Sequence, residues 1–413
     1  MNHRVVVTGI GAISPFGVGL QVYFDGLKAG KSGVCRIDDL MQLNGCRSRT
    51  GAKVQNFNPL DYMSNKSSRR MDRFAQFGVA ATKMALQDAG FNLEDPRLHN
   101  AGVFFGTAVG GFPYGEVQHE RFIRRGLSKV DPLLCSRVFY GCGVNEICIE
   151  LKIGGFVQSL TTGCVASADA IGSAFSLIRE GKSDIVICGG ADAPLAPLTY
   201  SSFYLIGVTS TKLANSPAPY DLTRDGIVLG EGAGILILED RESALKRGAR
   251  VYAELVGYGT THDAYHLTKP APDGRRVEEA MMLAFRDAHI DPAQVDHIAS
   301  HGCGTQISDQ IETEVLKRVF KNHVTQLTIS AIESMIGHPL GAVGALKSIA
   351  AILSIQNSVV FPTINYQTPD PVCNLDYVPN RSKEKEVNIA MVNAFSFGGK
   401  NSILLFKKHY VND

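Results

Sequence analysis

The segment Ala166–Ile178 constrains the fold more than any other part of the chain. It is small or apolar on nearly every face, with the side chains of Ala168, Ala170, Ile171, Ala174, Phe175 and Leu177. A helix that is apolar all round must be enclosed on all sides. The sequence therefore predicts a central helix with other elements packed around it.

Short apolar runs bounded by glycine predict the buried strands that would surround such a helix. They are Val5–Gly9, Gly102–Gly106 and Ile185–Gly190. Met71–Gly90 carries apolar residues at helical spacing and stops at a glycine, which is typical of an amphipathic helix. This alternation of strands and helices indicates a protein of the α/β class.

The second half of the sequence is a variation on the first. A strand, a helix and a strand are again predicted between residues 252 and 300. The closing strands also correspond, with Gly234–Glu239 in the first half and Asn401–Phe406 in the second. The simplest account is a duplicated α/β unit, with residues 1–250 and 251–413 as halves that pack face to face.

Composition excludes several classes of function. Lys and Arg number 41 and Asp and Glu 40, so the net charge argues against nucleic acid as a main partner. The sequence has no run of about 18 uninterrupted apolar residues that would predict a membrane span, and its N-terminal apolar run is too short for a signal peptide. The nine cysteines form no C-x-x-C pair, which argues against structural zinc. We expect a soluble cytoplasmic protein in a reducing compartment.

One cysteine has a setting that predicts a reactive sulfur. Cys164 follows Gly163 in a turn at the entrance of the central helix, and a helix N-terminus favours a thiolate over a thiol. Two histidines in glycine-rich settings, His301 and His338, come much later. A cysteine with two distant histidines is typical of acyl transfer. The other thiols, including Cys303, are interpreted as small buried apolar groups.

Four segments carry the candidate chemistry, namely Thr162–Ser167, His301–Thr305, Glu333–Gly341 and Asn393–Asn401. In this order and spacing they closely resemble the β-ketoacyl-[acyl carrier protein] synthases of the elongation type, and the resemblance spans nearly the whole chain. It implies a thiolase-like fold, with duplicated βαβαβαββ halves in a five-layer α-β-α-β-α sandwich. It also implies obligate dimers, and neither a cofactor nor a metal.

The resemblance implies a condensation reaction on a carrier protein. In that family a cysteine takes an acyl chain as a thioester, and decarboxylation of malonyl-carrier protein produces the carbanion that attacks it. Cys164 then becomes the nucleophile, while His301 and His338 polarise the malonyl thioester carbonyl. Two imidazole N–H donors can stabilise the negative charge on that oxygen. A second oxyanion hole is implied at the backbone N–H groups of Cys164 and Phe397, beside the flexible Gly398.

Further residues take supporting roles by the same resemblance. Phe397 matches a gating aromatic at the mouth of the acyl pocket, and Val109 matches a position on the wall of that pocket. Asp309 and Glu312 match acidic residues that support the histidine loop. Simple packing is the alternative for Phe397.

A basic cluster precedes the helix predicted at Met71–Gly90 and contains Lys66, Arg69 and Arg70. Charge runs are usually solvated faces, but these positions match those where family members dock the acidic carrier protein. The resemblance therefore implies acyl carrier protein as a partner, and either a second copy of the chain or a homologous chain-length factor as the dimer partner. It implies no membrane partner.

One departure from the family pattern concerns two charges. The family normally has lysine where this chain has Glu333, and glutamate where this chain has Lys347. A carboxylate five residues before His338 would by itself favour imidazolium and suggest a damaged enzyme. We hypothesise that the two signs are exchanged and that a buried ion pair survives in reversed polarity, because either orphan charge would be costly to bury. The alternative is two unrelated surface charges.

The turn at the nucleophile bears on the pathway. Thr162-Gly163-Cys164 is closer to the Thr-Gly-Cys of ketosynthases in type II polyketide systems than to the Thr-Ala-Cys of fatty-acid synthases. Asp192–Pro197 also looks polyketide-like. We therefore expect the ketosynthase subunit of a type II polyketide synthase, with a chain-length factor. The alternatives are a fatty-acid β-ketoacyl-ACP synthase II and a non-condensing partner subunit, and thiolase-like coenzyme A chemistry is disfavoured.

Overall fold

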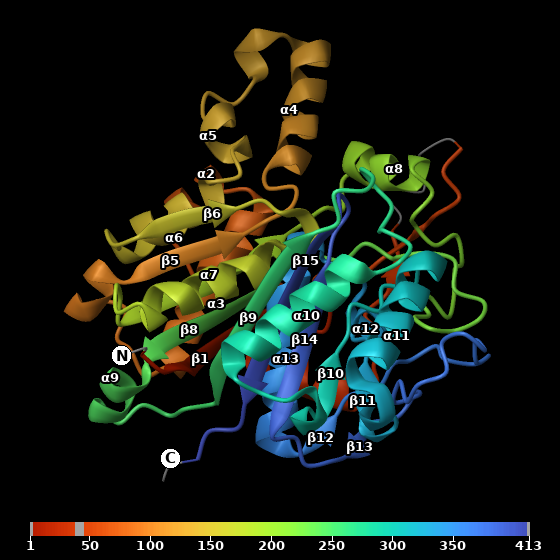
Figure 1. Cartoon of the computed structure of the whole chain (residues 1–413). Coiled ribbons are helices and arrows are strands. Elements are labelled where there is room, and N and C mark those ends of the chain that lie inside the picture. Colours follow the sequence, from red (N-terminus) through yellow and green to blue (C-terminus); the bar gives the residue numbers. More distant parts are fainter. Residues whose placement is uncertain (1–2, 38–44, 411–413) are drawn as a thin grey trace.

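The computed structural model describes residues 3–37 and 45–410. One mixed β-sheet, with strands from both halves of the chain, is its main element (Figure 1). The strands are β1 (Val5–Ser14), β2 (Gly17–Val18), β3 (Cys35–Arg36), β4 (Thr50–Gly51), β5 (Gly102–Gly106), β6 (Val157–Leu160), β7 (Ile185–Asp192), β8 (Gly232–Asp240), β9 (Ala253–His262), β10 (His297–Ala299), β11 (Thr328–Ser330), β12 (Val359–Val360), β13 (Lys383–Glu384), β14 (Ile389–Phe395) and β15 (Lys400–Lys407). The main sheet has the order β11-β10-β14-β15-β9-β1-β8-β7-β5-β6, and β2 pairs with β1. β3 pairs with β4, and β12 with β13, in separate ribbons.

Helices pack on both faces of this sheet, on the outside of the molecule and at its centre. They are α1 (Leu20–Lys28), α2 (Asn65–Arg70), α3 (Arg73–Asp88), α4 (Phe112–Arg125), α5 (Leu134–Val138), α6 (Cys142–Leu151), α7 (Ala166–Arg179), α8 (Pro197–Leu205), α9 (Arg241–Lys246), α10 (Arg275–Ala288), α11 (Gln306–Phe320), α12 (Glu333–Ile336) and α13 (Val343–Asn357). α7 packs on β5 and β7, α13 packs on β8 and β14, and these two helices contact each other. α3 covers β1 and β8 from outside, and α10 covers β9 and β15. The five-layer α-β-α-β-α architecture is confirmed.

The strand order of the first half is repeated in the second. In the first half, β5 is parallel to both β6 and β7, and β7, β8 and β1 then pair antiparallel. In the second half, β10 is parallel to both β11 and β14, and β14, β15 and β9 then pair antiparallel. The halves join through the antiparallel pair of β1 and β9. The predicted duplication of the fold is therefore present in the topology.

α7 is the enclosed helix that the sequence predicts, and its apolar side chains belong to the main hydrophobic core. α13 occupies the equivalent place in the second half and is buried from Val343 to Ile355. Among the described residues, Leu340–Asn357 is the one helical stretch long and apolar enough to cross a membrane, and 89% of it is buried inside the protein. Burial along most of its length explains why α13 lacks a polar face, whereas α7 keeps a narrow half-buried strip with Ser173, Ser176 and Arg179.

The first strand extends beyond its predicted end. The sequence predicts a strand that stops at Gly9, whereas β1 continues to Ser14. Gly11 lies directly against α3, where an added Cβ would come within 2.0 Å of the Ala81 carbonyl oxygen. The glycines in this strand therefore mark the close approach of a helix and not the end of the strand.

Candidate active site

The candidate nucleophile lies in a tight turn between β6 and α7. Gly163 in this turn has a φ of 70°, and a Cβ at that position would come within 2.3 Å of Ser396 Oγ. Glycine is the residue that tolerates both this conformation and this approach. The turn leaves Cys164 buried, with 7% of its surface exposed. Cys164 is thus held in a tight turn directly before the N-terminus of α7.

One cavity of about 520 Å³ brings the three predicted catalytic residues together, because Cys164, His301 and His338 all line it. Cys164 comes from the first half of the chain, His301 follows β10, and His338 lies between α12 and α13. The imidazole rings of the two histidines have centroids 5.9 Å apart and an interplanar angle of 78°. The remaining lining residues lie at 206–208, 224–227, 268–270, 303, 305–308 and 395–397.

A backbone contact sets the tautomer of His301. The N–H of Phe395 donates to His301 Nδ1 at 3.4 Å, which assigns the proton of the neutral ring to Nε2. Burial lowers the pKa of His301 well below its usual range, and the charge of Lys347 and the proximity of His338 lower it further. His301 is therefore a neutral imidazole with an N–H donor, which is the form that can stabilise a developing oxyanion.

His338 is held by its backbone. Its N–H donates to the Val228 carbonyl at 2.7 Å, and its own carbonyl accepts from the N–H of Gly230 at 3.0 Å. Burial lowers the pKa of His338 to about 3, and Lys347 adds to this effect. Its buried Nδ1 has no hydrogen-bond partner among the described residues. This second ring is also neutral at pH 7, but no side chain in the described part of the protein sets its tautomer at Nδ1.

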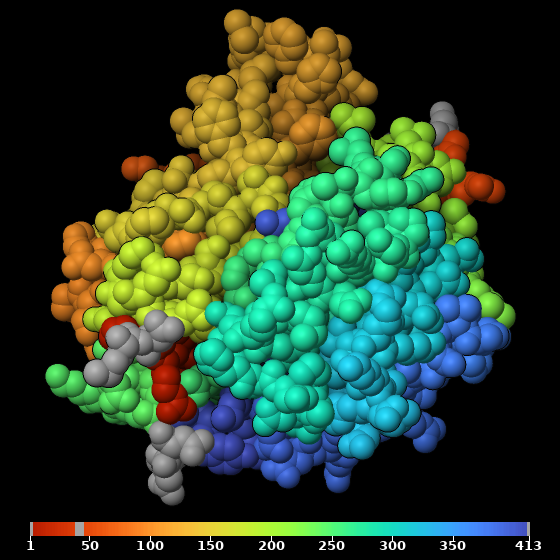
Figure 2. All heavy atoms as spheres, in the orientation of Figure 1, coloured from red at the N-terminus to blue at the C-terminus, as the bar shows by residue number. Residues whose placement is uncertain are grey.

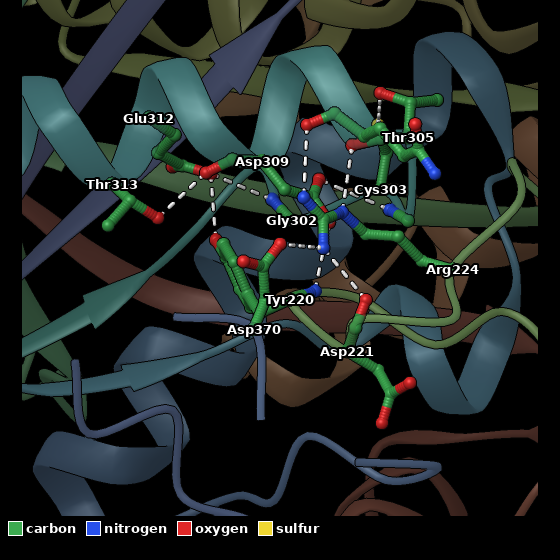
Figure 3. A network of polar contacts seen from close by, with 12 residues as sticks. Tyr220, Asp221, Arg224, Gly302, Cys303, Thr305, Asp309, Glu312, Thr313 and Asp370 are labelled. Atoms are coloured by element: carbon green, nitrogen blue, oxygen red, sulfur yellow. Dashed lines mark hydrogen bonds and ion pairs between the residues drawn. The ribbon is translucent and has the colours of Figure 1, made fainter. Parts of the chain in front are cut away.

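Glu312 anchors the loop that carries His301. Its carboxylate accepts from the backbone N–H groups of His301 at 2.8 Å and Gly302 at 2.9 Å. It also accepts from the Asn393 side chain at 2.9 Å and the Tyr220 hydroxyl at 2.8 Å. Figure 3 shows this buried carboxylate beside the loop. Two of its four hydrogen bonds go to the loop backbone, so Glu312 positions His301 without touching the ring.

Asp309 lies one helical turn away on α11 and ties the same loop to a buried arginine (Figure 3). Its carboxylate accepts from the N–H of Tyr220 at 2.9 Å and of Gly304 at 3.3 Å. Arg224 Nε lies 3.4 Å from Asp309, and its Nη1 lies 2.7 Å from Asp370. Burial raises the pKa of Asp309 to about 7, and Arg224 opposes that rise. The predicted supporting residues therefore contact the histidine loop and not the cavity.

The two exchanged charges form a fully buried contact. Lys347 Nζ lies 2.6 Å from Glu333 Oε1, and neither side chain is exposed. Burial raises the pKa of Glu333, with Lys347 acting in the opposite direction. The alternative of two unrelated surface charges is wrong. Lys347 Nζ also lies 3.5 Å from the carbonyl oxygen of His301 and 3.2 Å from that of Asn393.

This pair reverses one expectation from the sequence. A carboxylate near His338 would by itself favour imidazolium, but the charge that acts on both histidines is the ammonium of Lys347, which lowers their pKa values. Glu333 is compensated by Lys347 at 2.6 Å. The reversed pair therefore preserves neutral imidazoles.

The sulfur of Cys164 does not have the lowered pKa that a helix entrance alone predicts. Burial raises its pKa to about 11, and the negative charge of Asp192 adds to that rise. Hydrogen bonding from Ser396, the charge of Lys347 and the N–H of Phe397 act in the opposite direction. Enclosure in the cavity outweighs the helix effect, so the resting form at pH 7 is the thiol.

Two family models match most of the chain. The N-terminal domain of the β-ketoacyl synthases matches residues 2–244, and their C-terminal domain matches residues 252–367. The chain belongs to the β-ketoacyl synthase family. It is accordingly an acyltransferase of the condensing class.

Relatives of this synthase are found both among named proteins and among solved structures. It is 39% identical over 411 residues to 3-oxoacyl-[acyl-carrier-protein] synthase 2 of Synechocystis sp., covering 99% of each chain. It is 37% identical over 409 residues to the protein of that name from Staphylococcus aureus, covering 98% of this chain and 99% of the relative. Among solved structures, it resembles the ishigamide ketosynthase/chain length factor, with a TM-score of 0.93, 36% identity, and coverage of 99% of this chain and 100% of that chain. It also resembles a chain in a solved complex of a type II PKS acyl-carrier protein with its ketosynthase bound to the hexaketide, with a TM-score of 0.92, 33% identity and the same coverage.

Two residues assigned to the acyl pocket of this synthase lie in different places. Phe397 lines the catalytic cavity, is 36% exposed, and has its ring centroid 6.4 Å from that of Phe203. It is followed by Gly398, which has a φ of 84°. Val109 does not line that cavity but a separate depression of about 280 Å³ beneath α4 and α5. Its role in an acyl pocket stays a prediction, because the two hollows are distinct in the single chain.

The predicted docking cluster is only partly available to a partner. Lys66 and Arg69 are exposed on α2. The guanidinium of Arg70, by contrast, is engaged within the protein, with Nε 2.7 Å from Glu146 and Nη2 3.1 Å from Glu150. The prediction that Arg70 docks a carrier protein is therefore at odds with its internal contacts.

The positions of two residues at the site did not follow from the sequence reasoning. The interpretation of Cys303 as a buried core group is confirmed, since it is 5% exposed and belongs to one apolar cluster with Cys164, but it also lines the catalytic cavity. Burial raises the pKa of Cys303 to about 12, so it remains a thiol. Its place two residues after His301, in the same glycine-rich loop, was the signal that could have identified it.

Asp192 is the second of these residues, and it holds the loop after His338 against the first half. Its carboxylate accepts from the N–H of Gly341 and the hydroxyl of Thr107, both at 2.7 Å. It also accepts from the N–H of Ala108 at 2.8 Å. An acidic residue at the end of a buried apolar strand was the available signal, but the sequence does not indicate its distant partners.

Proposed function

We propose that this chain is the ketosynthase subunit of a type II polyketide synthase, which condenses a Cys164-bound acyl chain with malonyl-carrier protein. The observation that carries the proposal is the single cavity shared by Cys164, His301 and His338. A nucleophile and two neutral imidazole donors in one enclosed space are the groups that decarboxylative condensation needs.

The geometry supports a reaction in two stages. In the first, Sγ of Cys164 attacks the acyl-carrier thioester, the acyl group moves to Sγ, and the proton of Cys164 leaves with the carrier thiol. In the second, malonyl-carrier protein loses CO₂, and the electron pair of the broken bond forms an enolate. His301 and His338 stabilise its oxygen by hydrogen bonding. The carbanion then attacks the Cys164 thioester, and the cysteine sulfur leaves as a thiolate, which takes up a proton from water to restore the thiol.

A non-condensing partner subunit is less well supported. Such a chain would need no nucleophile and no paired histidines, whereas here all three side chains line the cavity. Glu333 was the feature that favoured an inactive chain, and its contact with Lys347 removes that argument.

We further propose that a homologous chain covers the arm formed by α4 and α5, which stands out from the body of the molecule (Figures 1 and 2). Phe122, Ile123 and Leu127 on this arm are 47%, 68% and 77% exposed. At the foot of the arm, β6 is an edge strand of the main sheet, and its Val157 is 37% exposed. Exposed apolar side chains beside an unpaired strand edge favour a protein partner. The structural resemblance to a ketosynthase/chain length factor supports a chain-length factor in this role.

Carrier-protein docking is proposed at α2, through Lys66 and Arg69. Replacing both by alanine should raise the apparent KM for carrier protein severalfold at low salt, with kcat unchanged. The effect should fade as salt rises, because exposed charges are screened. The exposed Lys182, replaced by alanine, is the matched control. Unchanged kinetics at low salt in the double variant would remove α2 from the proposal.

A fatty-acid β-ketoacyl-ACP synthase II is the second candidate function, and the relatives at 39% and 37% identity, both named 3-oxoacyl-[acyl-carrier-protein] synthase 2, support it. The turn Thr162-Gly163-Cys164 and the likeness to polyketide ketosynthases favour the first candidate. We also propose that the halves divide near residue 250 and that the protein is cytoplasmic. Neither of these points alters the test of the reaction.

Mass spectrometry after incubation with acyl- and malonyl-carrier proteins tests the reaction directly. We expect an acyl mass on Cys164, followed by a β-ketoacyl-carrier protein two carbons longer. Cys164→Ala should form neither product. Repeated extension with a co-expressed chain-length factor would favour the polyketide role, and saturated chains extended by the homodimer would favour the fatty-acid role. A folded, partnered protein that takes no acyl group would refute both.

A further inference from the structure

The turn between β14 and β15 brings a serine hydroxyl against the nucleophile. Ser396 opens this turn and is tied across it, with its N–H donating to the Lys400 carbonyl at 2.9 Å. Its carbonyl accepts from the N–H of Gly399 at 3.0 Å. Positive φ angles at Gly398 and Gly399 close the turn. The backbone of Ser396 is therefore well determined, and its side chain lines the catalytic cavity.

The hydroxyl of Ser396 meets the backbone of Cys164. The N–H of Cys164 donates to Ser396 Oγ at 3.0 Å, across 232 residues of sequence. The close fit is shaped on the other side by Gly163, where any Cβ would come within 2.3 Å of the same oxygen. A glycine at 163 and a serine at 396 thus fit together, and their meeting point is the N–H group of the nucleophile.

The same N–H group is also needed as a hydrogen-bond donor during acyl transfer. Acylation of Cys164 forms a tetrahedral oxyanion, and backbone N–H donors at the nucleophile are the usual means of stabilising it. The N–H of Cys164 is the donor that the family resemblance implies for this purpose, together with that of Phe397. In the present structure Ser396 Oγ accepts from that donor. One N–H cannot make a strong hydrogen bond to a hydroxyl and to an oxyanion at the same time.

We propose that Ser396 occupies the oxyanion-hole donor of the free enzyme, so that the incoming thioester carbonyl must displace its hydroxyl before Cys164 is acylated. The inference rests on the acyl transfer of the proposed function. Ser396 acts here as a positioning residue that keeps the buried N–H paired while no acyl group is bound, which avoids the cost of an unsatisfied buried donor. The bonds made and broken in acylation are unchanged, because the serine is neither acylated nor deprotonated.

The hydroxyl also has a proton to donate, and hydrogen bonding from Ser396 lowers the pKa of the Cys164 thiol. The serine therefore has two opposite effects. It favours the thiolate, which helps every reaction of the sulfur. It also occupies a donor that only acyl transfer needs, which hinders acylation alone. A reagent that attacks sulfur without forming an oxyanion separates these effects.

The test compares two reactions of Cys164 in Ser396→Ala. Alkylation by iodoacetamide at fixed pH reports the thiolate, and acylation by the hexanoyl thioester of N-acetylcysteamine reports the thiolate and the oxyanion hole together. We expect alkylation to fall about fivefold, the usual effect of losing one hydrogen bond. Acylation should fall less or rise, so the ratio of acylation to alkylation should increase about threefold or more. Ser396→Gly should behave in the same way.

Controls distinguish this effect from general damage. Ser354→Ala removes another buried hydroxyl, on α13 and outside the cavity, and should leave both rates unchanged. Thermal denaturation checks that each variant is folded. An unchanged or lower ratio in both Ser396 variants overturns the proposal, because the hydroxyl would then only support the thiolate or the turn. If the wild type accepts the small thioester but no carrier-bound acyl group, the proposed function fails and this inference stands.

Discussion

His301 and His338 lie in one cavity and are both buried and neutral, yet they are held in different ways. His301 receives a backbone N–H at Nδ1, and its loop is anchored by the Glu312 carboxylate. The backbone of His338 pairs with residues 228 and 230, while its Nδ1 has no partner in the described chain. The tautomer of the first ring is set by this contact, whereas no hydrogen bond at Nδ1 sets that of the second within the described chain. The difference suggests that the position of His301 depends on the Glu312 carboxylate, and that of His338 on the packing of its loop.

The charge of Lys347 acts on both histidines. Breaking its contact with Glu333 should have the largest effect of the changes considered, and that effect is on stability. Glu333→Lys or Lys347→Glu leaves two like charges buried and should cost about 3–5 kcal/mol of unfolding free energy, as a broken buried pair does. Restoring opposite charges in the double variant should recover only part of this loss, because a carboxylate at 347 would face the carbonyl oxygens of His301 and Asn393. Chemical denaturation measures all three variants. Single variants as stable as the wild type would show that the pair contributes nothing.

The neutral double variant Glu333→Gln/Lys347→Met is the control for this experiment. Neutral side chains of similar size often replace a buried pair at little cost, so this variant should be more stable than either single one. It also removes the ammonium that lowers the pKa of both imidazoles. Loss of decarboxylation on acidification should therefore begin at a higher pH than in the wild type. An identical pH profile would mean that Lys347 acts only through packing.

Removing either ring should have the next largest effect. His301→Ala and His338→Ala should each slow CO₂ release from malonyl-carrier protein by about a hundredfold to a thousandfold, the usual effect of losing one oxyanion donor. Acylation of Cys164 should survive in both. The exposed His99, replaced by alanine, serves as the control. If one variant keeps wild-type CO₂ release, the two rings do not share one oxyanion and the comparison between them fails.

A double-mutant cycle tests whether Glu312 acts only on His301. Glu312→Gln removes part of the loop anchor and should slow decarboxylation by about tenfold, a loss equivalent to one charged hydrogen bond. In a His301→Ala background it should cost nothing further, whereas in a His338→Ala background it should cost its full factor. The exposed Glu314→Gln on the same helix is the matched control. Equal losses in both backgrounds would mean that the anchor serves the whole site.

The smallest expected effect is on the pH dependence of the unfolding free energy, to which the two rings should contribute equally. The pKa of His338 is about 3 in the folded protein, against about 6.5 in the unfolded chain. Below pH 6.5 the unfolded chain binds a proton that the folded protein does not, so stability falls as pH drops towards 3. His338→Asn should reduce that slope by about 1.4 kcal/mol per pH unit, and His301→Asn should do the same. Urea denaturation between pH 5 and 8 measures this slope. If replacing a ring leaves the slope unchanged, that ring is already charged in the folded protein.

Much of the fold was predictable because it depends on local patterns. α7 is apolar on nearly every side because it is largely enclosed, and the two halves repeat one order of strands, so both could be recognised along the chain. The clustering of Cys164, His301 and His338 followed from family motifs. Their meeting in space could not have been derived from periodicity, since 137 residues separate Cys164 from His301 (301 − 164).

The failures share one physical cause, which is a partner distant in sequence. Arg70 looked available until Glu146 and Glu150 were placed beside it. The helix entrance predicted a lowered pKa for Cys164, but burial among residues distant in sequence raised it. The contact between Cys164 and Ser396 has no local signature at all. By contrast, the Glu333–Lys347 contact was predictable, because two opposite departures from one pattern compensate each other.

That compensated pair limits how this gene could exchange segments with its relatives. Glu333 begins α12 and Lys347 lies in α13, so the two positions are fourteen residues apart (347 − 333). A crossover between them would join this chain's Lys347 to the lysine usual in the family at 333, or the corresponding glutamates to each other. Either chimera would enclose two like charges under the histidine loop. Residues 333–347 must therefore be inherited, or grafted, as one block.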